Sequence, residues 1–193
     1  MNKAILMSIR PKRLIKILNG KKTLEIRKSV PKNFNKGWVN LYCTKGKPYL
    51  YKGGYKPMHD LNRNNPFNYH WVLNNEKWSI DLQNGKVVAR FWFDDWTFME
   101  GFHEDDISNS YAYNGLFDDN KNPKELCLSD MEVHDYGRGK DLYVWHIKNL
   151  EIFDKPKELS DFYGVKNYPK GQKIFPFICD KNDKECLDSF RIK

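Results

Sequence analysis

The sequence predicts an α+β fold, in which a small mixed β-barrel carries two or more short helices and a long insertion. Several short segments alternate apolar and polar residues, two others have helical spacing with start signals, and residues 45–84 show little sustained periodicity. A barrel is favoured because a closed sheet leaves no exposed strand edges.

The first two elements are a strand and an amphipathic helix. AILMSI, Ala4–Ile9, is apolar enough for a buried strand. The helix is predicted over Pro11–Asn19, because proline suits the first helical position and apolar residues follow at intervals of three and four. Gly20 is expected to end the helix.

A charged strand, TLEIR at Thr23–Arg27, comes next. Alternation places Glu25 and Arg27 on one face, and Lys22 would join them from the preceding turn, where strict alternation need not hold. Glu25 and Arg27 could pair with each other or could both face a ligand. The alternative is a solvated strand with a surface ion pair that contributes about 0 to 1 kcal/mol.

The remaining strands are predicted from alternation and apolar content. They are Trp38–Thr44, one long strand in GKVVARFWFDDWTFM (Gly85–Met99), and the closing strands Leu142–Ile147 and Leu150–Phe153. We expect Trp38–Thr44 to run beside the charged strand.

The second helix is predicted over Leu128–Tyr136 from its start signal. Ser129 followed three residues later by Glu132 forms a capping box, and Gly137 marks the end of the helix.

Two further segments lie outside this regular pattern. Residues 45–84 are expected to be a functional flap or a locally folded insertion close to the site. Residues 164–193 are expected to be a C-terminal tail packed on the barrel or partly disordered. The aromatic residues of the insertion could stack on bases or could only pin it to the barrel: Tyr49, Tyr51, Tyr55, Phe67, Tyr69, Trp71 and Trp78.

Three blocks of sequence carry a family resemblance. Ser8–Pro31 contains the G-x-K-x-x-E-x-R pattern, Leu41–Pro48 reads LYCTKGKP, and Tyr143–Tyr163 reads YVWHIKNLEIFDKPKELSDFY. Together they resemble the ASCH family, in particular its longer phage and prophage members. The resemblance implies a PUA-like barrel over residues 1–163 and a role in binding RNA or nucleotides.

Composition agrees with an anionic partner. Lysine and arginine number 33 against 25 acidic residues, which gives a net charge of +8 and favours nucleic acid or a nucleotide over a merely basic soluble protein. No apolar run approaches the roughly 20 residues of a membrane span, and the N-terminal apolar run is short for a signal peptide. We therefore expect a cytoplasmic protein without a membrane partner.

The cysteines give no sign of a metal site. Cys43, Cys127, Cys179 and Cys186 form no C-x-x-C pair and have no histidine at zinc-finger spacing. Cys179 and Cys186 could close a small loop or bind a metal, but reduced thiols are favoured in this compartment. We predict no metal and no cofactor.

The candidate ligand-binding residues surround the charged strand. Lys22 could contact phosphate or, if its pKa falls, act as a base or nucleophile. Glu25 could accept hydrogen bonds from a base or ribose, and Arg27 could bind a phosphate or a carbonyl edge. The predicted set is completed by Lys45, Lys47, Trp145 and His146, the last two on opposite faces of one strand.

The predicted function is binding of RNA or a nucleotide in a basic cleft. The resemblance also implies an alternative, hydrolysis of a modified nucleoside or of RNA, with Lys22 and Glu25 as candidate catalytic residues. The related amidohydrolases carry a threonine where Glu25 stands, and Glu125 matches their distant glutamate only loosely. A third possibility is an interaction protein that inhibits a host nucleic-acid machine.

Overall fold

The computed structural model describes residues 4–52, 69–72, 82–101, 112–113, 124–165 and 174–182 of the 193-residue chain. Its elements, in chain order, are β1 (Ala4–Ile9), α1 (Pro11–Leu18), β2 (Leu24–Arg27), β3 (Gly37–Cys43), β4 (Tyr49–Lys52), β5 (Tyr69–Val72), β6 (Val87–Phe93), β7 (Trp96–Glu100), β8 (Ala112–Tyr113), η1 (Lys124–Leu126), α2 (Asp130–Gly137), β9 (Leu142–His146), β10 (Lys148–Lys157), η2 (Leu159–Asp161), β11 (Phe162–Tyr163) and β12 (Ile174–Asp180).

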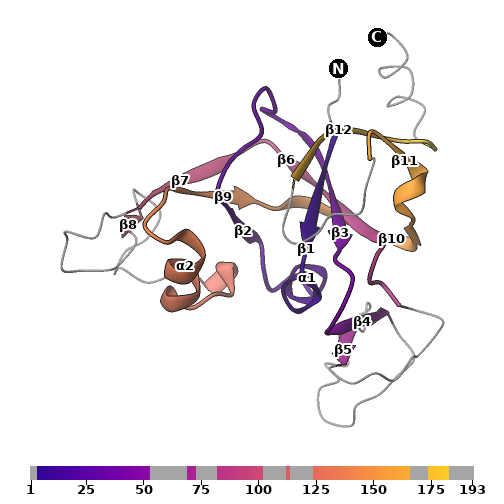
Figure 1. The fold of residues 1–193 in the computed structure, drawn as a ribbon, viewed down its shortest axis with the longest axis horizontal. Helices are drawn as coiled ribbons and strands as arrows, with labels where there is room; N and C mark the ends of the chain where they lie inside the picture. Colours follow the sequence, from indigo (N-terminus) through magenta and orange to yellow (C-terminus); the bar gives the residue numbers. More distant parts are fainter. Residues whose placement is uncertain are drawn as a thin grey trace.

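A curled six-stranded sheet forms a half-barrel, in the order β10-β6-β3-β1-β12-β11 (Figure 1). β1 and β3 run parallel, and the chain between them carries α1, whose apolar face covers one side of the sheet. Leu14 and Ile17 of α1 are fully buried against strand residues such as Met7 and Leu41. The predicted first strand and first helix are confirmed.

A second sheet, ordered β2-β9-β7-β8, extends from the half-barrel as an arm (Figure 1). One of its faces packs on α2, with Val133 of the helix against Ile26, Val144 and Met99 of the strands. Ser129 caps α2 as predicted: its Oγ accepts from the Glu132 backbone N–H at 3.3 Å, and Glu132 Oε2 accepts from the Ser129 N–H at 3.0 Å.

The prediction of one long strand over Gly85–Met99 is wrong. The chain leaves β6 at Phe93, turns through Asp94 and Asp95, and enters β7 in the other sheet at Trp96. Aspartate is disfavoured in strands, and two in succession allow the chain to turn a corner between the sheets. β9 and β10 pass the same corner at Ile147.

The prediction that Trp38–Thr44 runs beside the charged strand is also wrong. β3 pairs with β1 and β6 in the half-barrel, whereas β2 pairs with β9 in the arm. The physical reason is the crossover: a parallel β1–β3 pair requires the intervening chain, β2 included, to leave the sheet before it returns.

The insertion contains local structure. β4 and β5 pair with each other as a two-stranded sheet that lies against α1. The Asn84 side chain ties the two ends of the insertion together: its Nδ2 donates to the carbonyls of Gly46 and Pro48, and its Oδ1 accepts from the Leu50 N–H. Tyr55, Phe67 and Trp78 lie outside the described residues.

The predicted tail includes a sheet strand. β12 pairs with β1 along the half-barrel and with β11 on its other side. Its apolar run supplies Ile178 to a second core with Leu6, Tyr42 and Phe162. Residues 166–173 and 183–193, including Cys186, lie outside the described residues, so the nature of the tail as a whole stays a prediction. Among the described residues, Cys43, Cys127 and Cys179 are not in disulfide bonds.

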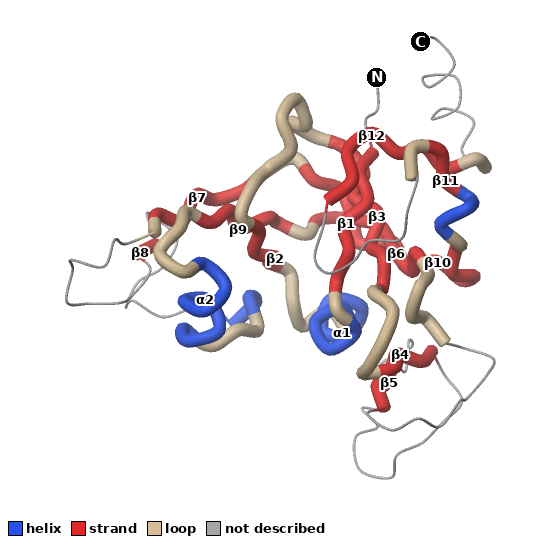
Figure 2. The backbone as a smooth tube through the Cα atoms, in the orientation of Figure 1, coloured by secondary structure: helices blue, strands red, loops and turns tan. Residues whose placement is uncertain are grey.

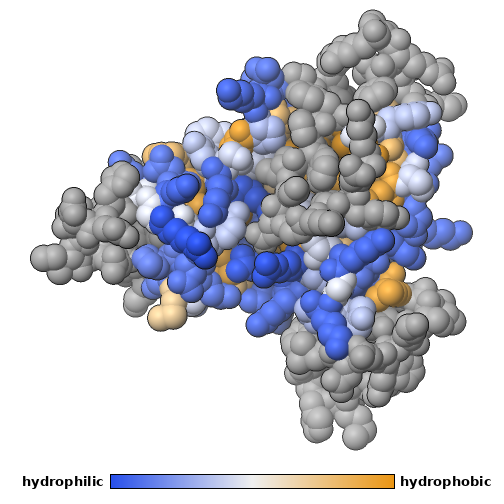
Figure 3. Space-filling model, in the orientation of Figure 1, coloured by the Kyte–Doolittle hydropathy of each residue, from blue (hydrophilic) through white to orange (hydrophobic). Residues whose placement is uncertain are grey.

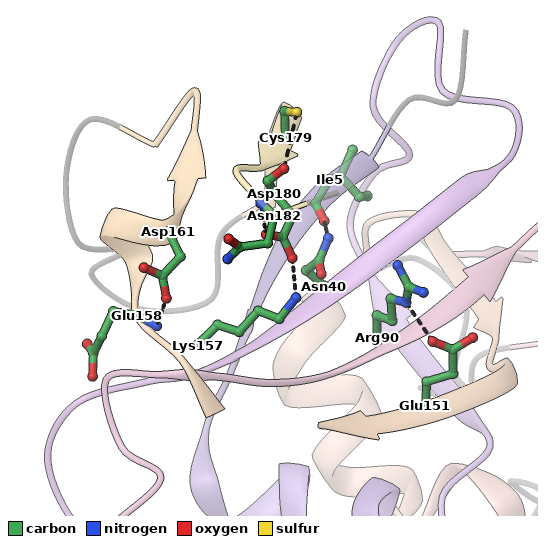
Figure 4. Close-up of polar contacts among 10 residues, drawn as sticks. All are labelled: Ile5, Asn40, Arg90, Glu151, Lys157, Glu158, Asp161, Cys179, Asp180 and Asn182. Carbon is green, nitrogen blue, oxygen red and sulfur yellow. Dashed lines mark hydrogen bonds and ion pairs between the residues drawn. The ribbon is translucent and has the colours of Figure 1, made fainter. Parts of the chain in front are cut away.

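The outer side of the half-barrel carries simple ion pairs (Figure 4). Arg90 Nε of β6 lies 2.7 Å from Glu151 Oε2 of β10, and Lys157 pairs with Asp180 of β12. The Arg90–Glu151 pair joins neighbouring strands, whereas Lys157 and Asp180 come from strands that are not neighbours in the sheet order. Within the described ranges, neither helix is long and apolar enough to pass through a bilayer.

Candidate functional site

The turn after α1 sets the position of the charged strand. Gly20 takes a positive φ of 69°, and the backbone N–H groups of Lys21 and Lys22 both donate to the Lys16 carbonyl, at 2.9 and 3.0 Å. Glycine adopts this left-handed conformation without the strain that a side chain would add. The Thr23 N–H then donates to the Glu125 carbonyl at 3.1 Å, which fixes β2 between α1 and the η1 segment.

Three charged side chains meet at the start of β2, and we call them the buried triad: Lys22, Glu25 and Arg27. Lys22 Nζ lies 3.3 Å from Glu25 Oε2, and Arg27 Nη2 lies 3.1 Å from Glu25 Oε1. The predicted convergence of the three side chains is confirmed, including the entry of Lys22 from the turn before the strand.

The triad is closed off from solvent. Lys22 and Glu25 are 1% exposed and Arg27 is 3% exposed, which excludes the solvated strand with a surface ion pair. Backbone carbonyls complete part of the shell: Lys22 Nζ donates to Leu126 O at 2.6 Å, and Arg27 Nη2 donates to Ser8 O at 3.2 Å. The open cleft expected here stays a prediction.

Some polar atoms of this cluster lack hydrogen-bond partners among the described residues. Arg27 Nε and the Nε1 of the neighbouring Trp145 are buried donors without a hydrogen-bond partner among these residues. Glu25 Oε2 receives no well-aligned hydrogen bond, although the Lys22 ammonium stands at 3.3 Å as an ion pair. Buried donors without partners are unusual in folded proteins, and an acceptor from a water, an ion or a ligand would satisfy them.

β2, which carries Glu25 and Arg27, lies between α1 and α2 (Figure 2). Tyr136 of α2 accepts a hydrogen bond from Arg27, and Arg13 of α1 acts electrostatically on both Tyr136 and Lys22. Lys28 Nζ lies 5.1 Å from the centre of the Tyr136 ring. Figure 3 shows hydrophilic side chains gathered over this side of the molecule, around the two helices.

Sequence reasoning missed Arg13 and Tyr136. Arg13 lies on the polar face of its helix and therefore resembles an ordinary solvated residue. Tyr136 reaches the site only because α2 packs across the arm, and nothing in the local sequence around it indicates that contact.

Burial alters the proton affinities at the site. Burial lowers the pKa of Lys22, and the attraction of Glu25 opposes this change. Burial also raises the pKa of the Tyr136 hydroxyl, while Arg27 works in the opposite direction. A lysine held this way loses its proton more readily than a solvated one, which is what a general base requires.

Trp145 belongs to the site and His146 lies away from it. Trp145 stands directly across from Glu25 in the β2–β9 pair, on the same face, and is fully buried. His146 faces the other side of β9, where its Nε2 lies 2.9 Å from Thr97 Oγ1. The predicted placement of the two residues on opposite faces is confirmed.

Lys45 and Lys47 occupy a different part of the molecule's surface. Both are exposed on the loop that follows β3, where the Lys45 side chain packs over Gly85. Their loop leads to β4, which lies against α1. A contribution of these lysines to ligand binding stays a prediction.

Two solved structures resemble the chain in fold. The crystal structure of ASCH from Zymomonas mobilis matches with a TM-score of 0.51 and 14% identity, over 98% of this chain and 94% of that one. A mutant of the same protein matches with a TM-score of 0.51 and 13% identity, over 98% and 96% of the respective chains. In sequence comparisons, no family model and no curated protein matches. The α+β half-barrel of this chain therefore has the fold of the ASCH protein from Zymomonas mobilis, as its sequence predicted.

Proposed function

We propose that the protein binds single-stranded RNA or a nucleotide and holds an anionic group of this ligand at Lys22 and Arg27. The observation that carries the proposal is the charge ratio of the buried triad, in which two cations share one carboxylate. Arg13 adds a further positive charge from α1.

An excess of buried positive charge is costly without a counter-ion. Desolvation of an ion costs several kcal/mol, so natural proteins pair such charges or use them to bind. A phosphate would supply both the missing negative charge and acceptors for the unpartnered Arg27 Nε and Trp145 Nε1. Arginine is suited to this role because its planar group binds phosphate through two parallel hydrogen bonds.

A ligand would reach the triad only after a neighbouring segment moves. The η1 segment is the candidate, since Leu126 O covers Lys22 Nζ and the Glu125 carbonyl holds the start of β2. Its displacement would cost two hydrogen bonds, and a phosphate could replace the one made by Lys22. We therefore expect binding to be slower than a simple diffusional encounter.

The test is a binding titration of fluorescently labelled single-stranded RNA by anisotropy, at several salt concentrations. The wild type should bind with a log–log salt slope of about 0.7 for each phosphate neutralised. Arg27→Gln should weaken binding by about tenfold or more, because it removes a charged partner of the phosphate. The matched control is Arg90→Gln, a strand arginine on the outer face that is already paired with Glu151.

Two results would contradict the RNA proposal. If the affinity does not change between low and moderate salt, the ligand is not a polyanion. If Arg27→Gln and Arg90→Gln lose the same amount of affinity, the triad is not the binding site. A ligand the size of one nucleotide would give a weaker salt slope together with the same difference between the two variants.

A second function is favoured by one specific observation, the lowered pKa of Lys22. We propose as the alternative that Lys22 acts as a base in hydrolysis of a modified nucleoside or of RNA, with Glu25 orienting it. Glu125 lies close by, since its carbonyl accepts from the Thr23 N–H. Thr23 and Glu125 are both exposed, whereas Lys22 is buried.

Turnover separates the two functions. Lys22→Arg keeps the positive charge but cannot act as a base, because arginine keeps its proton at working pH. An enzyme should lose its activity with this change, whereas a binding protein should lose little affinity. Incubation of concentrated wild-type protein with acetylated cytidine and with mixed RNA, followed by chromatography, should yield a product only if the alternative holds.

A further inference from the structure

One face of the arm carries two rows of side chains that continue outward from the triad. In the register of the three strands, Glu25 of β2 stands opposite Trp145 of β9, which stands opposite Trp96 of β7. In the next row on this face, Arg27 stands opposite Tyr143, which stands opposite Phe98. Each row therefore begins at a buried charge and continues through two aromatic rings.

The outer part of these rows is accessible. Trp96 is 41% exposed, and Tyr143 and Phe98 are half-buried, whereas Trp145 is fully buried in the main core. The Trp96 and Tyr143 rings meet edge to face with centroids 5.0 Å apart, and Phe98 and Tyr143 do the same at 5.7 Å. We call Trp96, Phe98 and Tyr143 the aromatic shelf.

The two faces of the arm differ in how they are covered. The opposite face carries Ile26, Met99 and Val144, which are buried under α2. A sheet face whose function were only to pack would be expected to have a comparable cover, and Trp96 is one of three large apolar side chains that are exposed among the described residues. Exposed aromatic rings beside a charged site are typical of surfaces that bind a ligand.

We propose that the aromatic shelf stacks the unpaired bases of a single-stranded nucleic acid whose phosphate is held at the buried triad. This inference rests on the proposed function and names the part of the ligand that lies outside the triad. Aromatic rings bind bases of any sequence, because every base presents a flat π-face. Single-stranded nucleic acids are bound in this way, by basic groups that hold the backbone and aromatic rings that hold the bases.

The spacing agrees with such a ligand. Neighbouring strands lie about 4.8 Å apart, so the distance from β2, which carries Arg27, across β9 to β7, the outer strand of the shelf, is about 10 Å. Stacked nucleotides rise about 3.4 Å each, and this length suits two or three bases. A double helix does not offer its base faces, so the occupant must be single-stranded.

The charges around the shelf are unevenly distributed. Lys28 is exposed and directly follows Arg27, and its ammonium lies over the Tyr136 ring of α2. At the outer end, Asp94 and Asp95 precede β7. Lys148 Nζ lies 2.8 Å from the Asp94 carboxylate and is also attracted by Asp95. We therefore expect the phosphate at the inner end of the rows, at the triad, and the bases at the outer end.

The experiment compares two RNA probes of equal length, an oligoadenylate and an abasic oligomer that keeps the sugar-phosphate backbone. Both are titrated against the wild type, Trp96→Leu and Trp96→Tyr by anisotropy. The oligoadenylate should bind the wild type at least about fivefold more tightly than the abasic probe, and Trp96→Leu should remove that difference. Trp96→Tyr keeps an aromatic ring and should retain most of the difference in affinity between the two probes.

Tyr163→Leu is the matched control. Tyr163 is 44% exposed, close to the value for Trp96, but lies on β11 at the edge of the half-barrel. This change should leave the affinity for oligoadenylate within about twofold of the wild type. Circular dichroism melting checks that each variant folds, and Phe98→Leu tests the second row if Trp96→Leu does not fold.

The outcomes distinguish the shelf from the triad. If the wild type binds both probes equally and Trp96→Leu does not change this, the shelf does not bind bases, and the proposed phosphate site at the triad is unaffected. Failure of the wild type to bind either probe would overturn the shelf together with RNA binding as the proposed function. A dimer in sedimentation that Trp96→Leu dissociates would show that a second copy of the chain covers these rings, and would also overturn the shelf.

Discussion

The buried triad and the outer ion pairs use the same side chains for different purposes. On the outer side of the half-barrel, Arg90 pairs with Glu151, and the two side chains are 29% and 47% exposed (Figure 4). In the triad, Lys22 and Arg27 share Glu25, and all three are at most 3% exposed. The charges of Arg90 and Glu151 cancel, whereas the triad has a net positive charge.

The difference matters because water screens the charges of the outer pair but is excluded from the triad. An exposed pair gains little and can be lost with little effect. A buried charge depends wholly on its partners, and removal of one partner leaves an uncompensated ion that costs about 3–5 kcal/mol. A chain that keeps such a cluster carries a permanent energetic cost, which a ligand-binding role would explain.

The largest expected effect is therefore at Glu25. Glu25→Gln leaves Lys22 and Arg27 without a counter-ion and should lower the free energy of unfolding by about 3–5 kcal/mol. Urea denaturation followed by tryptophan fluorescence measures this change. If the triad binds phosphate, a mononucleotide should restore more stability to the variant than to the wild type. A decrease in the free energy of unfolding below about 1 kcal/mol would mean that the triad contributes no more to stability than an exposed ion pair.

The next effect concerns pH. Because the folded pKa of Lys22 lies below its ordinary value of 10.5, the unfolded chain binds this proton more tightly. Stability should therefore rise with pH between the lowered pKa and 10.5, by at most about 1.4 kcal/mol per pH unit. Lys22→Met should flatten this rise in urea titrations at successive pH values. An equally steep rise in the variant would assign it to another group.

A smaller effect is expected at the start of α2. Ser129→Ala removes the hydroxyl that accepts from the Glu132 N–H and should cost about 1 kcal/mol. Because α2 carries Tyr136 to Arg27, hydrogen exchange should quicken in residues 130–137 and at β2, while β10 and β12 keep their protection. Uniform acceleration across both sheets would mean that α2 does not open separately.

The smallest effect is expected at the outer pair. Glu151→Gln makes the same chemical change as Glu25→Gln, but should alter stability by no more than about 1 kcal/mol. Urea denaturation at low and high salt measures it, and added salt should shrink the difference. A loss as large as that of Glu25→Gln would remove the contrast between the two regions.

Local signals predicted much of this architecture. Pro11, the apolar spacing after it and Gly20 define α1, and Ser129 with Glu132 defines α2, because helix ends depend on nearby residues. The meeting of Lys22, Glu25 and Arg27 also followed from the sequence, since all three lie within one turn and one strand.

Features that depend on distant parts of the chain were not predicted. The break at Asp94 and Asp95 falls within an alternating pattern. The two aspartates disfavour a strand locally, but the passage from one sheet to the other depends on the whole topology. The burial of the triad depends on Leu126 and Tyr136, more than a hundred residues further along the chain. The pairing of β2 with β9 rather than β3 is likewise a property of the whole topology.

The pairing of β1 with β12 has a consequence for synthesis of the chain. β1 is an interior strand, and its second neighbour is formed by residues 174–180. While the ribosome is still making the preceding segments, the apolar β1 has β3 on one side and an open edge on the other. A nascent chain that stalls before this point exposes a template for pairing with other chains. Prompt completion or shielding by a chaperone would protect the chain during this interval.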